Sequence, residues 1–349
     1  MTAFRRLCRA DTPRMTHTSL THYCEQHLDE TLSLLQEMVE INSFTGNAAG
    51  VNRLGELTAR AFARLGFEPT FVASSHPAYG NHLVLKRPQV SDLPTIALVS
   101  HLDTVFPEEE ERRNAFHWRR EGTRIHGPGT NDIKGGTVLM HLMLSALQAE
   151  APEVFAAANW VILLNACEEE SSVDFRELAK AQLPPDTLAC LVFEGDGGGP
   201  GETSLVTARK GRVTFTIEVE GRGAHAGSSH KRGVNAVVEL ARIVTDLHQL
   251  TSYEEDLTVN VGSFYGGGPV NRVPHSAQAE LEMRAFSPEA YGRVRRSILA
   301  LAGEGSLRSI DADAHPSRIT VTPGDETPPW PRNGFTNHLA AIWYQAGLG

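Results

Sequence analysis

Residues 95–103 read TIALVSHLD, a short apolar run that passes directly into a histidine and an aspartate. Two later runs, Trp160–Leu164 and Leu188–Phe193, have the same form. Short apolar runs of this kind are typical of strands that are buried on both faces of a parallel sheet. A helical pattern near residues 136–148 separates the first two runs. This order of elements predicts an α/β domain with a mostly parallel central sheet.

Two segments before these strands repeat apolar residues at the spacing of a helix face. Residues 28–41 and residues 53–65 both have this pattern, and Gly66 supplies a stop for the second. The alternation of helix and strand runs from about Tyr23 to Arg209. We therefore assign residues 23–209 to one domain.

Residues 210–322 have a different pattern. Val213, Phe215, Ile217 and Val219 alternate with polar residues, which is typical of a half-exposed strand. Further segments complete the order βαββαβ of a ferredoxin-like sandwich: helix 235–247, strand 258–264, strand 277–285, helix 291–301 and strand 318–322. We expect these residues to form an inserted lid domain.

The predicted domains leave two terminal segments. The proline-rich stretch 327–332 is typical of a linker, so we assign residues 323–349 to the first domain. Residues 1–22 are expected to form a disordered extension. They contain four arginines with no apolar stretch after them, so a secretory signal is not indicated. A mitochondrial-type arm and a start at Met15 both stay open.

The composition excludes several classes of protein. The 349 residues carry a formal net charge of −10 without a basic stripe, so neither nucleic acid nor an anionic membrane is an expected partner. No apolar segment reaches the roughly 18 residues that span a bilayer. The four cysteines contain no C-x-x-C pair. This indicates neither a disulfide framework nor a zinc knuckle, and it favours a reducing cytoplasmic location.

Each of the three apolar runs leads into residue types that bind metals. His101 follows the first run, Glu169 lies among three glutamates after the second, and Glu194 follows the third. Ligands of open α/β sheets bind beyond the carboxyl ends of the strands, so we expect these side chains to meet at one edge. Taken singly, each residue has a common structural explanation, such as a packed histidine or a solvated charge run. Their combination favours a metal site.

The glycine-rich loop 127–136, GPGTNDIKGG, adds Asp132 just before a helix. Glycines on both sides allow a close approach of the backbone. A carboxylate near a helix N-terminus is favoured as an anion and can bridge two cations. The alternative for Asp132 is an ordinary helix cap.

These segments resemble one family of enzymes. SHLDTVFP, GPGTNDIKGG, ACEEESS and LVFEGD are similar to the metal-site motifs of the dinuclear-zinc family of acetylornithine deacetylase, succinyl-diaminopimelate desuccinylase, aminoacylase and glutamate carboxypeptidase. Residues 208–227 and 266–285 resemble that family's inserted dimerisation domain. The resemblance extends from about residue 28 to the end, and it is strongest for the glutamate carboxypeptidase branch.

The resemblance implies a site with two divalent ions, zinc with cobalt or manganese as alternatives. Four residues are the implied ligands: His101 and Glu194 for one ion, Glu169 for the other, and Asp132 as the bridge. Asp103 would orient His101, as metal-bound imidazoles usually require. Glu168 would take the proton of the attacking water and deliver it to the leaving amine.

In the lid, the resemblance implies three residues that meet the substrate. His225 would reach into the site of the partner subunit of a homodimer and support the oxyanion. Asn271 and Arg284 would hold the substrate's carboxylate, which the planar guanidinium of arginine suits. Other histidines match no motif, and we expect ordinary surface or loop positions for them: His82, His117, His126 and His315.

The sequence departs from the family at two places. Cys167 stands where the family more often has Asp or Thr, and Ser171 stands where it more often has Gly. We expect metal ligation to be unaffected by these two differences. The family also continues after its lid and supplies a last histidine ligand to the Glu169-bound ion. This chain stops at Gly349 after a predicted helix 337–346, and His338 lies too early for that role. We therefore expect a truncated product with little activity.

The predicted function is metal-dependent hydrolysis of an amide bond in a small amino-acid conjugate or dipeptide with a free carboxylate. Both a carboxypeptidase and an N-acyl amino acid deacylase fit, and the acyl group and the released amino acid stay open. The alternative is a catalytically impaired remnant that binds metal and dimerises. An oxidoreductase or transferase is not indicated, because no G-x-G-x-x-G follows a first strand and no P-loop is present.

Overall fold

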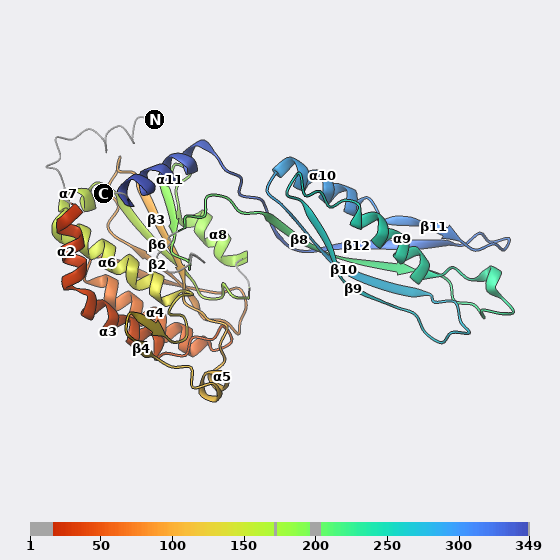
Figure 1. Cartoon of the computed structure of the whole chain (residues 1–349), viewed down its shortest axis with the longest axis horizontal. Helices are drawn as coiled ribbons and strands as arrows, with labels where there is room; N and C mark the ends of the chain where they lie inside the picture. Colours follow the sequence, from red (N-terminus) through yellow and green to blue (C-terminus); the bar gives the residue numbers. More distant parts are fainter. Residues whose placement is uncertain (1–16, 171–172, 196–203, 348–349) are drawn as a thin grey trace. The chain divides into compact units, whose positions relative to one another are not determined.

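The computed structural model describes residues 17–170, 173–195 and 204–347. Contacts divide the chain into two compact units, Met1–Gly197 and Gly198–Gly349. Each unit has its own five-stranded sheet (Figure 1). The assignment of residues 323–349 to the first domain stays a prediction.

The sheet of the first unit has the order β1-β2-β6-β3-β7. The three strands expected from the apolar runs are present and run parallel: β3 (Thr95–His101), β6 (Asn159–Asn165) and β7 (Ala189–Val192). Two antiparallel strands that the sequence did not predict extend the sheet beyond β6: β1 (Glu68–Ala73) and β2 (Asn81–Lys86). The α/β class is confirmed, and the sheet is mixed.

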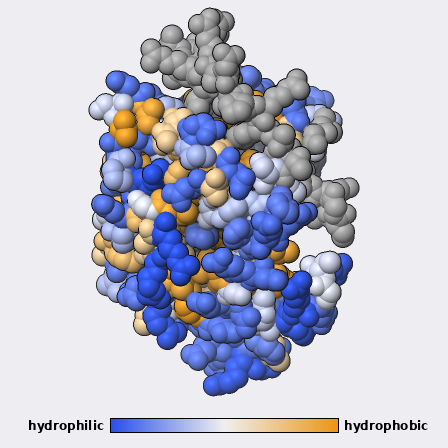
Figure 2. Space-filling view, turned by 90° about the vertical axis from the view of Figure 1, so that its left-hand side faces the viewer, coloured by the Kyte–Doolittle hydropathy of each residue, from blue (hydrophilic) through white to orange (hydrophobic). Residues whose placement is uncertain are grey.

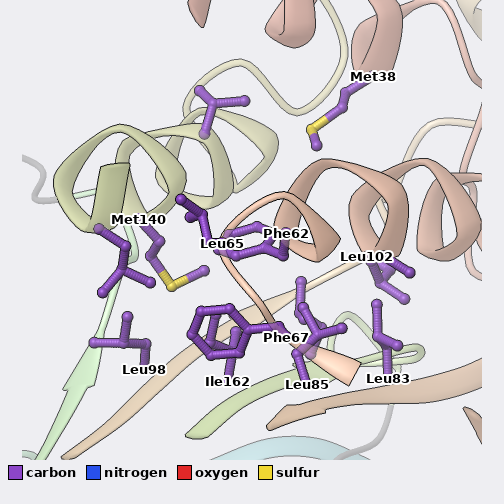
Figure 3. Close-up of a cluster of buried hydrophobic side chains, with 14 of the residues drawn as sticks. Met38, Phe62, Leu65, Phe67, Leu83, Leu85, Leu98, Leu102, Met140 and Ile162 are labelled. Carbon is purple, nitrogen blue, oxygen red and sulfur yellow. The ribbon is translucent and has the colours of Figure 1, made fainter. Parts of the chain in front are cut away.

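The main core of this unit lies between the sheet and three helices: α3 (Leu28–Val39), α4 (Ala48–Ala63) and α6 (Lys134–Glu150). Leu83 and Leu85 of β2 and Leu98 of β3 point into this layer, where they meet Phe62 of α4 and Met140 of α6 (Figure 3). Leu35 and Leu54, which lie in the two predicted helical patterns, belong to this core, whereas Leu28 at the start of the first pattern is exposed. This packing fixes the sheet whose carboxyl edge carries the predicted ligands.

The opposite face of the sheet carries a smaller cluster. Val84 of β2 and Phe175 of α8 (Val173–Gln182) belong to it, together with Val161 and Leu163 of β6. His82 points to the same face as Val84, because side chains two residues apart in a strand share a face. The expectation of a surface or loop position for His82 is wrong: the residue lies in β2 and is 1% exposed.

The first described element is helix α2 (His17–Gln26). Residues 17–22, which we expected to be part of a disordered extension, are therefore helical. Residues 1–16 lie outside the described chain. Smaller elements complete the unit: α5 (Glu108–Arg113), β4 (Arg119–Glu121), β5 (Arg124–His126) and α7 (Pro152–Ala156).

The second unit is an antiparallel sheet of order β11-β12-β8-β10-β9. The helices α9 (Ala236–His248) and α10 (Pro288–Leu299) lie on one face of the sheet (Figure 1) and enclose the second core. The elements are β8 (Gly211–Glu220), the 3-10 helix η1 (His230–Arg232), α9 (Ala236–His248), β9 (Thr258–Gly266), β10 (Ser276–Ala285), α10 (Pro288–Leu299), β11 (Gly303–Arg308) and β12 (Pro316–Thr327). Without β11, this is the predicted βαββαβ order, and the ferredoxin-like class is confirmed.

The additional edge strand β11 was not predicted, because its sequence GEGSLR has two glycines and no apolar alternation. Its backbone is fixed instead by Glu239 of α9, a buried carboxylate. Glu239 accepts hydrogen bonds from the N–H groups of Ser306 and Leu307 at 3.1 and 2.6 Å and from the Ser317 hydroxyl at 2.6 Å. The backbone of β11 is therefore held in place by a tertiary contact with α9.

The chain then ends with helix α11 (Gly334–Gly347), at the place where a helix over 337–346 was expected. None of the helices in the described ranges is long and apolar enough to cross a membrane. Hydrophilic residues predominate on the face seen in Figure 2, with hydrophobic residues in patches between them.

Candidate active site

Three predicted ligands converge at the carboxyl edge of the first sheet. His101 is the last residue of β3, and Glu194 follows β7 by two residues. Because β3 and β7 are parallel, both side chains come to the same edge. Nε2 of His101 lies 2.9 Å from Oδ1 of Asp132 and 3.6 Å from Oε1 of Glu194. The three residues offer ligand atoms that all lie within 4.8 Å of one another.

Glycines bring the Asp132 loop against the end of β7. A Cβ atom on Gly136 would lie 2.1 Å from the backbone oxygen of Phe193. A Cβ atom on Gly195 would lie 2.5 Å from the amide nitrogen of the Asn131 side chain. The contact at Gly136 is with backbone and is too close for any other residue, whereas at Gly195 the end of the Asn131 side chain would have to shift. Gly136 thus permits the close approach of the Asp132 loop to the end of β7.

The buried residue Asp103 holds the imidazole of His101. Nδ1 of His101 lies 3.0 Å from the backbone oxygen of Asp103 and 3.3 Å from its Oδ1. This contact directs Nε2 toward Asp132 and Glu194. Burial alone lowers the pKa of His101, but its hydrogen bonds to Asp103 and Asp132, with the charge of Glu194, raise that pKa to about 10. The carboxylates around Nε2 create a negative electrostatic environment, which suits a divalent cation.

Asp103 also fixes the glutamate loop after β6. Its Oδ1 accepts the backbone N–H of Glu168 at 2.9 Å, and its Oδ2 accepts that of Glu169 at 3.2 Å. The Thr45 hydroxyl donates to Oδ2 at 2.7 Å. One buried carboxylate therefore ties the histidine strand to the loop of the predicted base.

The two glutamates occupy different positions. Glu168 is exposed and lines a cavity of about 160 Å³ together with His101 and Glu194. Glu169 is half-buried, and its carboxylate is not part of the group formed by the other ligands. Burial and the nearby charge of Asp132 raise the pKa of Glu169 to about 7. The carboxylate of Glu169 therefore lies close enough to Asp132 for that charge to raise its pKa, but it is not part of the group formed by His101, Asp132 and Glu194.

Two residues that support the site were not predicted. Thr45 is one, and the other is Lys134, a buried residue whose Nζ donates to the backbone oxygen of Ile41 at 2.9 Å. Burial lowers the pKa of Lys134 to about 8. Lys134 was visible inside GPGTNDIKGG, but nothing in the sequence indicated its burial. Thr45 carried no signal at all.

The lid residues are divided between the two ends of their sheet. The backbone N–H of Ala226, next to His225, donates to the backbone oxygen of Asn271 at 2.8 Å, so His225 and Asn271 lie together. Arg284 is near the end of β10, beside Glu282, to which its Nε donates at 2.7 Å. Ser171 and Asp196, both within the quoted motifs, lie outside the described residues.

Comparison with known proteins adds a family match. Residues 207–308 match the model of the M20 peptidase dimerisation domain. Carboxypeptidase G2 of Pseudomonas sp. (strain RS-16) is 25% identical over 293 residues, which cover 84% of this chain and 68% of that protein. The protein named "Probable carboxypeptidase" of Trichophyton verrucosum is 28% identical over 74% of this chain. This chain spans 59% of the length of the fungal protein.

A solved structure has the same fold over most of its length. The YXEP protein of Bacillus subtilis, described as a dinuclear metal-binding peptidase from the M20 family, aligns with a TM-score of 0.60. The alignment covers 93% of this chain and 81% of that one at 13% identity. At this identity the likeness concerns the fold.

Proposed function

We propose that this chain, which is similar to the M20 family of metallopeptidases near the glutamate carboxypeptidase branch, hydrolyses an amide bond in a short peptide or small amino-acid conjugate. The observation that carries this proposal is the convergence of His101, Asp132 and Glu194 on one position at the edge of the sheet. A pre-oriented histidine with two carboxylates is a suitable ligand set for zinc.

His101, Asp132 and Glu194 would hold one ion, and Glu169 with the bridging Asp132 would hold a second. Bound ions of this kind polarise a scissile carbonyl and lower the pKa of water. The donor set fits the first ion, because Nε2 of His101 faces both carboxylates while Nδ1 is engaged by Asp103. The identity of the metal as zinc is part of the proposal.

Glu168 is the proposed general base. Its carboxylate is exposed at the cavity that His101 and Glu194 also line, so it can reach a water molecule beside the ligands. Its backbone is held by Asp103, which limits the positions that the side chain can reach. In the proposed reaction Glu168 removes a proton from the attacking water and returns it to the nitrogen of the leaving amine.

The lid is proposed to bind the substrate. Arg284 would pair with the substrate's carboxylate by exchanging its present contacts with Glu282. Nδ1 of His225 accepts the N–H groups of Gly227 and Ser228, each at 3.1 Å. The proton of a neutral His225 ring is therefore on Nε2, from which it can be donated to an oxyanion.

The positions within one lid support a shared active site. Arg284 pairs with Arg212 at one end of the sheet, whereas Ser276 pairs with Glu220 at the end near His225. Ser276 and Arg284 are eight residues apart in β10, which corresponds to about 27 Å. One small substrate cannot span this distance. If Arg284 and His225 both contact it, they must come from two lids, and a homodimer is the proposed assembly.

The second candidate is a metal-binding, dimerising protein with impaired turnover. The observation that favours it is that the Glu169 carboxylate stands outside the cluster of three ligands. Metal content and turnover separate the two candidates.

The test measures both quantities on purified protein. Wild type and Asp132→Ala are dialysed, analysed for zinc, and assayed with a panel of N-acyl amino acids and dipeptides in added zinc. We expect wild type to retain metal and hydrolyse at least one class of substrate, and Asp132→Ala to lose both properties. Retained metal without turnover of any substrate would favour the second candidate. Full metal content in Asp132→Ala would refute the assigned site.

A further inference from the structure

A second buried group of polar residues lies behind the glutamate loop. His82 of β2, Cys167 and Asp174 of α8 offer polar atoms within 4.8 Å of one another. His82 and Cys167 are each 1% exposed. The ring of His82 lies 5.5 Å from that of Phe175. A histidine held so deeply in an apolar cluster is costly to bury unless both ring nitrogens have partners.

The ring nitrogens of His82 contact two different segments. Nδ1 accepts the backbone N–H of Ala166 at 3.1 Å. Nε2 lies 3.2 Å from Oδ2 of Asp174. Because Nδ1 is an acceptor, the neutral ring carries its proton on Nε2, the nitrogen that faces the carboxylate. His82 therefore bridges the backbone of Ala166 to Asp174.

Asp174 is itself fixed by the turn after β1. Its Oδ2 accepts the Ser74 hydroxyl at 2.8 Å and the Ser75 N–H at 2.7 Å. Its Oδ1 accepts the N–H of Phe175 at 2.8 Å. The carboxylate also lies in the first turn of α8, where a negative charge is favoured. Asp174 is thus a rigid anchor for the His82 ring.

The bridge completes a series of contacts along the loop. Four consecutive backbone N–H groups, those of residues 166–169, each donate to a side chain. Ala166 donates to His82, Cys167 to Asn165 at 3.1 Å, and Glu168 and Glu169 to Asp103. Two separate anchors therefore hold this short segment, with Asp103 on the metal side and His82 on the far side of the sheet.

We propose that His82 and Asp174 are positioning residues that set the backbone of residues 166–169, and through it the carboxylates of Glu168 and Glu169. The link to turnover rests on the proposed hydrolase function. The arrangement needs no direct contact between His82 and a substrate. Outer residues of this kind typically change the activity or metal affinity of a site by about 10–100-fold.

A cation site at these three residues is the competing explanation. It conflicts with the hydrogen bond from Ala166, because a neutral imidazole that accepts at Nδ1 carries a proton on Nε2, and a protonated nitrogen cannot coordinate a metal. The described contacts therefore favour a bridge in which Nδ1 of His82 accepts a hydrogen bond from Ala166 and Nε2 faces Asp174 at ion-pair distance.

The test compares three variants of the full chain. His82→Leu removes both contacts of the ring. His82→Asn keeps a side-chain acceptor near the position of Nδ1 and loses the contact with Asp174. Val84→Ala is the matched control, because Val84 is buried in the same strand on the same face and makes no side-chain hydrogen bond. Hydrogen exchange of the peptide that contains residues 166–169, kcat and KM are measured for each protein.

We expect faster exchange of residues 166–169 in His82→Leu, with kcat about 10–100-fold lower and KM within about twofold of wild type. His82→Asn should recover part of the slow exchange and part of the kcat of wild type. Val84→Ala should match wild type in exchange and in kcat even if its melting temperature falls. The proposal is overturned if folded His82→Leu exchanges and turns over like wild type, or if Val84→Ala reproduces its defects. If wild type has no turnover, the proposed function fails, while the exchange comparison still decides whether His82 sets the loop.

Discussion

Oδ1 of Asp103 accepts the backbone N–H of Glu168 at 2.9 Å and lies 3.3 Å from Nδ1 of His101. A single buried oxygen therefore contacts both the predicted metal ligand and the backbone of the predicted base. Asp103 follows the strand that ends at His101, and Glu168 lies in the loop after β6. The two residues are 65 positions apart in the sequence. Their relative position depends on this carboxylate.

The first prediction concerns this carboxylate. Asp103→Asn replaces one acceptor oxygen by an amide that cannot accept an N–H group. We expect turnover and metal affinity to fall by about 10–100-fold, as for other residues that support metal ligands. Thr45→Val is the matched control, because it removes only the hydroxyl that donates to Oδ2. Chelator competition and steady-state kinetics provide the measurement. Equal effects of the two changes would mean that Asp103 acts through general packing.

The second prediction separates proton transfer from ligation. Glu168→Gln should retain bound metal, because Glu168 is not a proposed ligand, and should lose about 10²–10⁴-fold in kcat. The neighbouring exposed residue offers a control: Glu170→Gln should keep both metal and turnover. Metal analysis and kcat are measured on the same preparations. Loss of metal in Glu168→Gln would instead assign this residue as a ligand.

The third prediction tests the shared site. Glu168→Gln and His225→Ala should each have low turnover, since each lacks one group required at every site. If His225 serves the site of the partner subunit, a mixed dimer contains one site with both groups intact. Mixing the variants under conditions of subunit exchange should then restore part of the activity. Mass spectrometry verifies that mixed dimers form, and no recovery in their presence would argue against the shared site.

The fourth prediction concerns pH and the lid. Burial by itself raises the pKa of Glu239, but hydrogen bonds from Ser317, Leu307 and Ser306 lower it below its ordinary value. A carboxyl whose folded-state pKa is lowered stabilises the fold above its unfolded pKa of about 4.3, and this stabilisation is lost as the pH falls through the folded value. Glu239→Gln should therefore destabilise the lid at pH 7 by about 2 kcal/mol, with a difference that shrinks below about pH 4.

Urea unfolding of both proteins from pH 3 to pH 8 measures this effect. Glu304→Gln in β11 is the control, because that carboxylate is exposed. Its free energy of unfolding should differ little from that of wild type at any pH. A Glu239→Gln difference that stays constant down to pH 3 would show that the charge of Glu239 does not support β11.

The sequence predicted the elements whose signal is local. The run Thr95–Val99 became a largely buried strand, and the alternation from Val213 to Val219 became a strand with one buried face, because apolar periodicity reports directly which face of a segment meets the core. It also predicted that His101 and Glu194 lie at strand ends, and parallel pairing then brought them to one edge. The glycines of GPGTNDIKGG indicated a close approach, which the structure locates at Gly136.

Elements with weak local signals were missed. β2 is polar at both ends, and β11 contains two glycines, so neither has the composition of a strand. The contact between His82 and Ala166, 84 residues apart, and the contacts of Glu239 with residues 306 and 307 fix the local backbone. Such contacts cannot be deduced from either segment alone. They exist only after sheet order and helix packing have brought the segments together.

The amino-acid sequence by itself determined the fold class and the types of side chain at the strand ends, because periodicity and composition act over a few residues. Tertiary structure decided which of those side chains meet. It brought Asp132 to within 2.9 Å of His101, left the Glu169 carboxylate outside that group, and separated Arg284 from His225 within one lid. The physical reason is that a ligand cluster is defined to within about an ångström, and only the packing of distant segments sets positions at that scale.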